Sequence, residues 1–316
     1  MNEFTWSSFM RAGSSVLNQM LGAATPVALA ALGGLMTEHA GIMNIGMDGM
    51  ILMGAFVAAA VSYYLASAVL GILAAMIFGI LIGLFFALFT VKLRSDEFII
   101  GCALNTLAMG ITAYLSRSLF GSEGIRGAAY LHSINIPLIK DIPFVGNAIS
   151  GHNLFVYLTW LLVVVMWLFV YRTPMGFWIR ASGESPETLR TAGKNPERMK
   201  WIASILCGVF CGLAGASLSL GKLNGKFTEG MSDSRGYIAF ACVIFGAANP
   251  SKVYLAALMF GFFSALGLQL QGVLSSDLTE AIPYVITIIM MVYVVVSGQR
   301  KRERLAKQQL KKLELK

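Results

Sequence analysis

The chain has 316 residues, of which 57% are hydrophobic and only 13% are charged, and its formal net charge is +8. This composition is too apolar for an ordinary water-soluble domain, and the apolar runs are continuous rather than alternating, which excludes an outer-membrane β-barrel. We therefore expect an all-α fold, a polytopic transmembrane helical bundle.

Nine apolar runs follow one another, and most approach the ~20 residues that a helix needs to cross a hydrocarbon core of about 30 Å. The first contains Ala28-Leu29-Ala30, which fits a signal-peptide cleavage pattern, but the run continues past it without a polar exit, so we do not expect cleavage. The seventh run is short, so we expect about nine spans, within a range of about 8 to 10. The runs are 15–36, 47–67, 69–91, 98–119, 153–171, 201–220, 237–249, 252–272 and 282–298.

The first polar stretch, "MTEHAGIMNIGMDGMILMGAF" at 36–56, contains no lysine or arginine. Its glycines would allow the backbone to break at membrane depth, which is tolerated only where the break is buried in protein or faces water. Asn44 and Asp48 could then satisfy the freed backbone groups or contact a polar solute. Both interpretations of Asn44 and Asp48 stay open. The glycines that would allow the break are Gly41, Gly46 and Gly49.

Two segments suggest an internal repeat. "GMDGMILMGAF" after the first run has a loose counterpart in "GMSDSRGYIAFACVIFG" after the sixth. If the spans alternate, runs 1 to 4 begin outside and runs 6 to 9 begin inside, so the halves would be inverted about run 5, as in many transporters. Small residues four apart also predict close helix contacts, at Gly79 with Gly83 and at Gly208 with Gly212.

The charge is mainly a topology signal. Seventeen of the 24 lysines and arginines fall on one side of the alternating spans, which the positive-inside rule assigns to the cytoplasm. The N-terminus is then outside and the C-terminus inside, with residues 1–298 as the transmembrane domain and 299–316 as a basic cytoplasmic tail. The tail is expected to contact anionic membrane lipid or a partner. Because the positive charge of the chain is explained by topology, it does not indicate nucleic-acid binding. The external segment 121–152 carries enough apolar residues to pack on the bundle or on an external partner.

Within the cytoplasmic loop 172–200, Ser185, Pro186 and Glu187 form a helix start signal, and Gly193 suits a left-handed stop. A helix over 186–192 is predicted, and Asn195-Pro196-Glu197 repeats the start signal for a helix that runs into the sixth span. A helix of about two turns is too short to be stable alone. It either packs as a surface elbow or docks on a cytoplasmic partner.

No energy-converting or catalytic motif is present. The closest approach to a phosphate-binding loop is "GASLSLGKL" at 215–223, but its spacing is one residue too long and Leu223 replaces the Ser or Thr. Cys207 and Cys211 lie one turn apart with no nearby His or acid, so packing is expected rather than a metal site. Ionisable residues cluster at the ends of the runs, which weakens the case for an ion-coupled carrier.

Four ordered motifs carry a family resemblance: "TEHAGIMNIGMDGMILMGAF", "SDEFIIGCALNTLAMGI", "TPMGFWIRASGESPETLRTAGKNPERMK" and "SRGYIAFACVIFGAANP". In order and separation they resemble membrane permease subunits of bacterial ABC importers, in the group for branched-chain amino acids, ribose and other simple sugars. The chain is most similar to the nucleoside or simple-sugar branch. The segment 121–152 and the lysine-rich tail match no pattern of the family.

The resemblance implies a permease without chemistry of its own, in the cell membrane, that forms part of a translocation path for a nucleoside or simple sugar. It implies a second homologous permease, a cytoplasmic ATPase with two nucleotide-binding domains that uses ATP and Mg, and an external substrate-binding lipoprotein. No cofactor or metal is expected on this chain itself. The alternatives are a branched-chain amino acid permease and a self-sufficient ion-coupled carrier.

Carried over by position, the resemblance implies two groups of residues. The group beside the translocation path comprises Asn44, Gly46, Asp48, Gly49, Asn105, Ser232, Arg235 and Gly236. Phe240 is expected on the same path for a different reason, because an aromatic face suits an uncharged polar solute. The group that couples to the ATPase comprises Gly183, Glu184, Ser185, Pro186, Glu187, Ala192 and Gly193.

Overall fold

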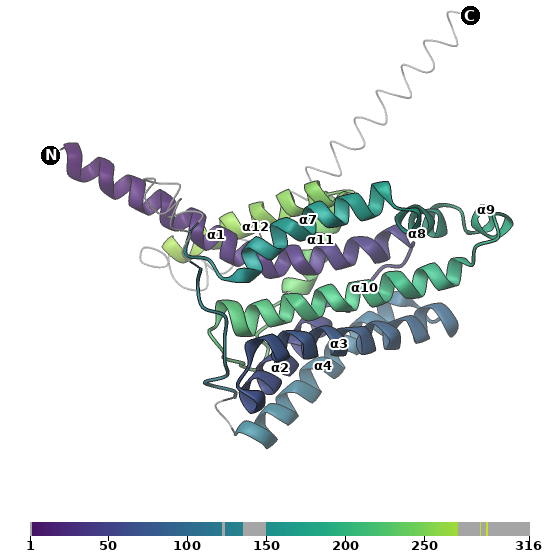
Figure 1. The fold of residues 1–316 in the computed structure, drawn as a ribbon, viewed down its shortest axis with the longest axis horizontal. Coiled ribbons are helices and arrows are strands. Elements are labelled where there is room, and N and C mark those ends of the chain that lie inside the picture. Colours follow the sequence, from purple (N-terminus) through teal and green to yellow (C-terminus); the bar gives the residue numbers. More distant parts are fainter. Residues whose placement is uncertain (1, 122–123, 135–149, 271–284, 286–288, 290–316) are drawn as a thin grey trace, which may run out of the picture.

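The computed structural model describes residues 2–121, 124–134, 150–270, 285 and 289. Within these residues the chain is helical, with two isolated β-bridges and no strand (Figure 1). In chain order the helices are α1 (Asn2–His39), α2 (Met47–Leu65), α3 (Ala68–Ala87), η1 (Leu88–Lys92), α4 (Glu97–Phe120), α7 (Leu154–Arg172), α8 (Pro174–Glu184), α9 (Pro186–Thr191), α10 (Pro196–Ala216), η2 (Ser217–Lys222), α11 (Arg235–Phe245) and α12 (Pro250–Leu270). The two η segments are π-helical and extend α3 and α10.

Seven helices of the described residues are long and apolar enough to cross a membrane. They confirm the first six runs and the eighth, while the ninth run lies almost entirely outside the described residues. The short seventh run forms α11, a helix of 11 residues that is too short to span a bilayer alone. The seven are Gly13–His39, Met47–Leu65, Ala68–Lys92, Glu97–Phe120, Leu154–Arg172, Pro196–Lys222 and Pro250–Leu270.

The helix α10 lies at the centre of the bundle, with α1 on one side and α3 on the other (Figure 1). The two small-residue pairs predicted to make helix contacts meet each other here. A Cβ built on Gly79 would collide with the carbonyl of Gly208, and one on Gly83 would collide with the carbonyl of Ser204. The predicted packing is therefore confirmed, because only glycines let these backbones come so close.

The loop 172–200 folds into two short helices, α8 and α9, at one end of the bundle (Figure 1). The apolar runs do not predict α8, although Thr173 and Pro174 are its start signal, and the Thr173 hydroxyl accepts a hydrogen bond from the amide of Gly176 at 3.2 Å. The predicted helix over 186–192 is α9, which ends one residue earlier than expected. Gly193 follows it with φ +77°, as the left-handed stop requires.

Candidate functional site

The chain breaks between α1 and α2, as predicted, over residues 40–46. It turns at Gly41, whose φ of +69° favours glycine. It is then held by Asn44, whose Oδ1 accepts a hydrogen bond from the Gly46 amide at 3.0 Å. The Asn44 amide nitrogen lies 3.3 Å from the Cys207 sulfur on α10. Asn44 thus satisfies a backbone group that the break sets free.

The other two glycines of this stretch serve packing rather than the break, which corrects the expectation for them. Gly46 has φ −72°, a value open to any residue, and Gly49 lies inside α2. A Cβ on Gly49 would lie 2.9 Å from both the Cα of Asn105 and the Cβ of Ala108. The start of α2 therefore lies directly on α4, which leaves no room for a side chain.

Asn105 of α4 caps the start of α2 from a different helix. Its Oδ1 accepts a hydrogen bond from the Gly49 amide at 2.7 Å, and its Nδ2 donates to the Ile45 carbonyl at 3.1 Å. The Gly49 amide is one of the N-terminal groups of α2 without an intrahelical partner. The same Nδ2 donates to the phenol oxygen of Tyr237 on α11 at 2.8 Å. One buried amide therefore joins α2, α4 and α11.

Asp48 caps the start of α11 in the same manner. Its Oδ1 accepts a hydrogen bond from the Gly236 amide, and its Oδ2 accepts one from the Ser232 hydroxyl, both at 2.9 Å. The two backbones touch, since a Cβ on Gly236 would collide with the amide of Asp48. The two stretches that looked alike in the sequence are thus in direct contact, and the N-termini of α2 and α11 face each other. We call Asn44, Asp48, Asn105, Ser232 and Gly236 the junction.

The junction lies well inside the membrane-spanning helices. Cys207, which Asn44 contacts, is 11 residues into α10, or about 17 Å along the helix at ~1.5 Å per residue. Asn105 is 8 residues into α4, or about 12 Å. Both estimates place these polar groups within the ~30 Å hydrocarbon core. Asn44, Asp48 and Asn105 are buried, and each makes hydrogen bonds to groups of the protein, as buried polar side chains require.

Arg235 and Phe240 lie beside the junction rather than in it. Arg235 donates to the carbonyls of Met231 and Ser232 at 3.0 and 3.1 Å, and its guanidinium is 3.3 Å from the Asp233 carboxylate. Arg235 thereby stabilises the turn before α11, in which Asp233 and Ser234 have positive φ values of +47° and +58°. Phe240 lies five residues further along α11, half-buried against the apolar core.

A second pair of charges lies at the C-terminal end of α4. Arg117 of α4 makes a two-pronged ion pair with Glu229 at 2.6 and 2.7 Å. The hydrogen bond from Arg117 lowers the pKa of the Glu229 carboxyl below its ordinary value. Part of segment 121–152 packs here, because Ile125 forms a β-bridge with Phe227. Of the two predicted alternatives for this segment, the bundle or another partner, its described part shows packing on the bundle.

The break touches the loop helices at one point that the sequence pattern does not predict. A Cβ on Gly183, the penultimate residue of α8, would collide with the carbonyl of His39 and lie 2.7 Å from the amide of Gly41. In return, a Cβ on Gly41 would lie 3.1 Å from the Cα of Gly183. Backbone meets backbone here, so a displacement of α8 acts directly on the break. We call this contact the Gly41–Gly183 joint.

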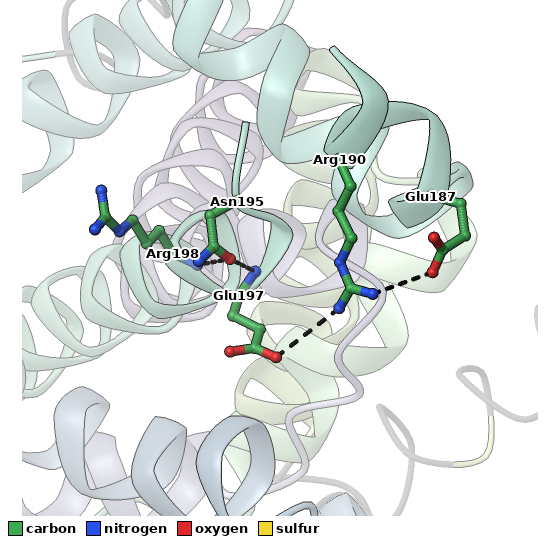
Figure 2. A network of polar contacts seen from close by, with 5 residues as sticks. All are labelled: Glu187, Arg190, Asn195, Glu197 and Arg198. Carbon is green, nitrogen blue, oxygen red and sulfur yellow. Dashed lines mark hydrogen bonds and ion pairs between the residues drawn. The ribbon is translucent and has the colours of Figure 1, made fainter. Parts of the chain in front are cut away.

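The helix α9 presents mostly exposed side chains. Leu189 is its buried residue, 4% exposed. Figure 2 shows Arg190 between Glu187 of its own helix, at 3.2 Å, and Glu197 at the start of α10, at 4.0 Å. Asn195 caps α10 as predicted, accepting from the Glu197 amide at 2.9 Å. The remaining residues predicted to couple are exposed or half-buried: Gly183, Glu184, Ser185, Pro186, Ala192 and Gly193.

One expected cap differs in detail. The Ser185 hydroxyl does not bond to a backbone amide of α9, and lies instead 2.7 Å from the Thr188 hydroxyl. A cation–π contact adds to the fold of the loop, with the Lys194 ammonium 4.3 Å from the centre of the Trp178 ring on α8. The loop is thus held by several weak local contacts, and its outer face stays open to solvent.

The sequence of this chain is similar to those of known membrane permease proteins. The family model for the permease component of branched-chain amino acid transport systems matches residues 16–295. TsgC13 of Haloferax volcanii is 33% identical over 83% of this chain and 80% of its own length. NupC of Lactococcus lactis is 30% identical over 87% and 90%, and NupQ of Bacillus subtilis is 30% identical over 78% and 79%.

These three relatives bear the names of glucose, nucleoside and guanosine ABC transporter permease proteins, respectively. No solved structure matches the chain. The family match covers most of the chain and includes the break, the junction and the loop helices. The chain therefore belongs to the permease component family of branched-chain amino acid-type ABC transport systems and is a multi-pass protein of the cell membrane.

Proposed function

We propose that this subunit forms part of the path by which a nucleoside or simple sugar enters the cell, and that a separate ATPase drives it. The observation that carries the proposal is the continuous series of contacts from α8 through the break to the junction. The Gly41–Gly183 joint connects the exposed loop to the break, and Asn44 and Asp48 connect the break to α10 and α11. Movement of the loop is thereby transmitted to polar groups at membrane depth.

The arrangement of α2 and α11 supports alternating access. Both helices start at the junction with their N-termini facing each other, a feature of inverted repeats in transporters. The proposed orientation puts the N-terminus outside, and α8 and α9 on the cytoplasmic side, where the ATPase would bind. A second permease subunit would complete the path, and an external binding protein would deliver the solute.

The chain would contribute no chemistry and bind no cofactor, since ATP and Mg would be used by the partner ATPase. The choice of solute rests on the names of the relatives, which include nucleoside, guanosine and glucose permeases. Few charges lie near the junction, and Arg235 is paired with Asp233. This suits an uncharged polar solute better than an ion or a zwitterion.

Transport by the reconstituted complex tests the function. Proteoliposomes that hold both permeases and the ATPase, with binding protein outside, should import guanosine or glucose only when ATP is supplied to the ATPase side. Uptake of leucine alone would transfer the chain to the amino acid branch. Uptake by this subunit alone on a Na⁺ or H⁺ gradient would instead make it an ion-coupled carrier.

Charge reversal on α9 tests the coupling. Glu187→Lys should reduce ATP-driven uptake and ATPase binding, although the ion pair that it breaks is exposed and worth at most about 0.5 kcal/mol. The triple variant Glu187→Lys/Arg190→Glu/Glu197→Lys restores both ion pairs of residue 190 with reversed polarity, and serves as the control. If these pairs matter only to the fold of the loop, the triple variant will recover uptake. If α9 docks on the ATPase, it will not.

A further inference from the structure

Tyr237 differs from the residues around it at the junction. It lies in the first turn of α11 and is 43% exposed, whereas Asp48, Asn105 and Ser232 are less than a tenth exposed. Its phenol oxygen is nevertheless tied to the junction by Asn105 at 2.8 Å. The phenol oxygen is therefore fixed by a hydrogen bond, while part of the side chain is exposed.

The direction of this hydrogen bond follows from the partners of Asn105. The Gly49 amide can only donate, so the Asn105 oxygen faces it, and the Ile45 carbonyl can only accept, so the Asn105 nitrogen faces that carbonyl. The nitrogen must then donate to Tyr237. The phenol keeps its own hydrogen, which has no acceptor among the described residues. Tyr237 presents both a ring face and a free O–H donor.

The side on which Tyr237 lies cannot be lipid. The turn before α11 is irregular backbone, and the Tyr237 amide bonds to the Ser234 carbonyl of that turn. Asp233 and Ser234 are exposed there, and Asp233 pairs with Arg235. Exposed irregular backbone and charges do not face lipid within the hydrocarbon region, and are tolerated where they line water or contact protein. Because Tyr237 follows this turn directly, we infer that its exposed ring also faces water or protein rather than lipid.

We propose that Tyr237 is a solute-contacting and specificity-determining residue of the path. Its ring would stack on an uncharged, ring-shaped polar solute, and its O–H would donate to a carbonyl or hydroxyl oxygen of that solute. The inference rests on the proposed function and assigns the contact to a residue that the sequence motifs do not single out. A tyrosine suits this task because its ring needs little ordering and its hydroxyl adds polarity at one end.

Thiol accessibility tests which way Tyr237 faces. In a Cys102→Ser background, whose remaining three cysteines are buried, Tyr237→Cys should react with a charged, water-soluble thiol reagent. Leu81→Cys is the matched control, because Leu81 is 55% exposed on the apolar helix α3. We expect at least a roughly tenfold faster reaction at position 237, since thiolate formation needs water. Equal, slow reaction at both positions would overturn the inference.

Transport then tests the contact. Tyr237→Leu should lower the maximum uptake rate about five- to tenfold, the loss expected for one aromatic contact. The half-saturating solute concentration should hold, because the binding protein sets it. Tyr237→Phe keeps the ring and should lose only about threefold, the effect of one neutral hydrogen bond. Tyr63→Leu, at an exposed tyrosine near the far end of α2, should transport as the wild type does.

A comparison of guanosine with glucose distinguishes a stacking contact of the Tyr237 ring from a hydrogen bond of its hydroxyl. Guanosine has a flat base that stacks, so Tyr237→Leu should reduce its uptake more than that of glucose. Wild-type rates for Tyr237→Leu with both solutes would refute the contact, whereas a lower melting temperature in step with the lower rate would indicate a structural role. If the wild type imports neither solute, the proposed substrate class fails, and thiol reactivity still decides where Tyr237 faces.

Discussion

Asp48 offers the sharpest test of how the junction works, because two substitutions separate its hydrogen bonds from its charge. Asp48→Ala removes both acceptors and leaves the Gly236 amide and the Ser232 hydroxyl buried without them. Asp48→Asn has the same shape. Its oxygen can accept from Gly236, and its nitrogen can donate to the Ser232 hydroxyl, which can accept as well as donate.

The magnitudes follow from these contacts. A hydrogen bond to a charged group contributes about 1.5–3 kcal/mol, so Asp48→Ala should cost about 3–6 kcal/mol. That is a large part of the ~5–15 kcal/mol that stabilises a typical domain. Asp48→Asn should cost only about 1–2 kcal/mol, since it loses the charge-assisted part of each bond and the favourable effect of an anion at two helix N-termini.

Thermal unfolding in detergent and ATP-driven uptake in proteoliposomes are the measurements. We expect Asp48→Ala to unfold at a much lower temperature and to transport little, and Asp48→Asn to retain most of both properties. Ser232→Ala, which removes one donor, should fall between them. A stable Asp48→Asn protein that cannot transport would refute the reasoning, because the negative charge itself would then take part in transport.

Three further predictions follow from the contacts. Gly183→Ala should uncouple ATP hydrolysis from uptake, since overpacking the Gly41–Gly183 joint costs about 1–3 kcal/mol, whereas Gly22→Ala, whose Cβ meets nothing within 4 Å, should behave as the wild type. Asn105→Ala should lower the unfolding temperature, because the buried Gly49 amide loses its acceptor at a cost of about 1–3 kcal/mol, and normal stability would contradict the trans-capping role. Because the pKa of the Glu229 carboxyl is lowered, its ion pair with Arg117 should stabilise the fold fully above pH 4.5, the ordinary value, and this stabilisation should be lost as the pH falls below it. The melting temperatures of the wild type and Glu229→Gln should therefore differ near neutral pH and converge in acid. A difference that persists in acid would contradict this.

Much of the helical framework could be predicted from the sequence, because its signals are local. Continuous apolar runs predict spans through their length, and Gly79 with Gly83 illustrates how small residues four apart indicate close packing. The helix start at Pro196 was predicted from its cap and proline alone. The helix α8 was not predicted, since its apolar residues form too short a run and its start signal precedes no long periodic stretch.

The sequence by itself determined that the protein is a helical membrane protein, that the chain breaks near Asn44, and that a short helix follows Ser185. Only the tertiary structure decided what the polar side chains do. Asp48 finds its partners 184 and 188 residues away, and Asn105 meets Gly49 across 56 residues. Hydrogen bonds between such distant positions leave no local pattern, because they depend on which helix starts are brought together. For the same reason the sequence alone does not show that Asn105 of α4 holds Tyr237 of α11 at the junction.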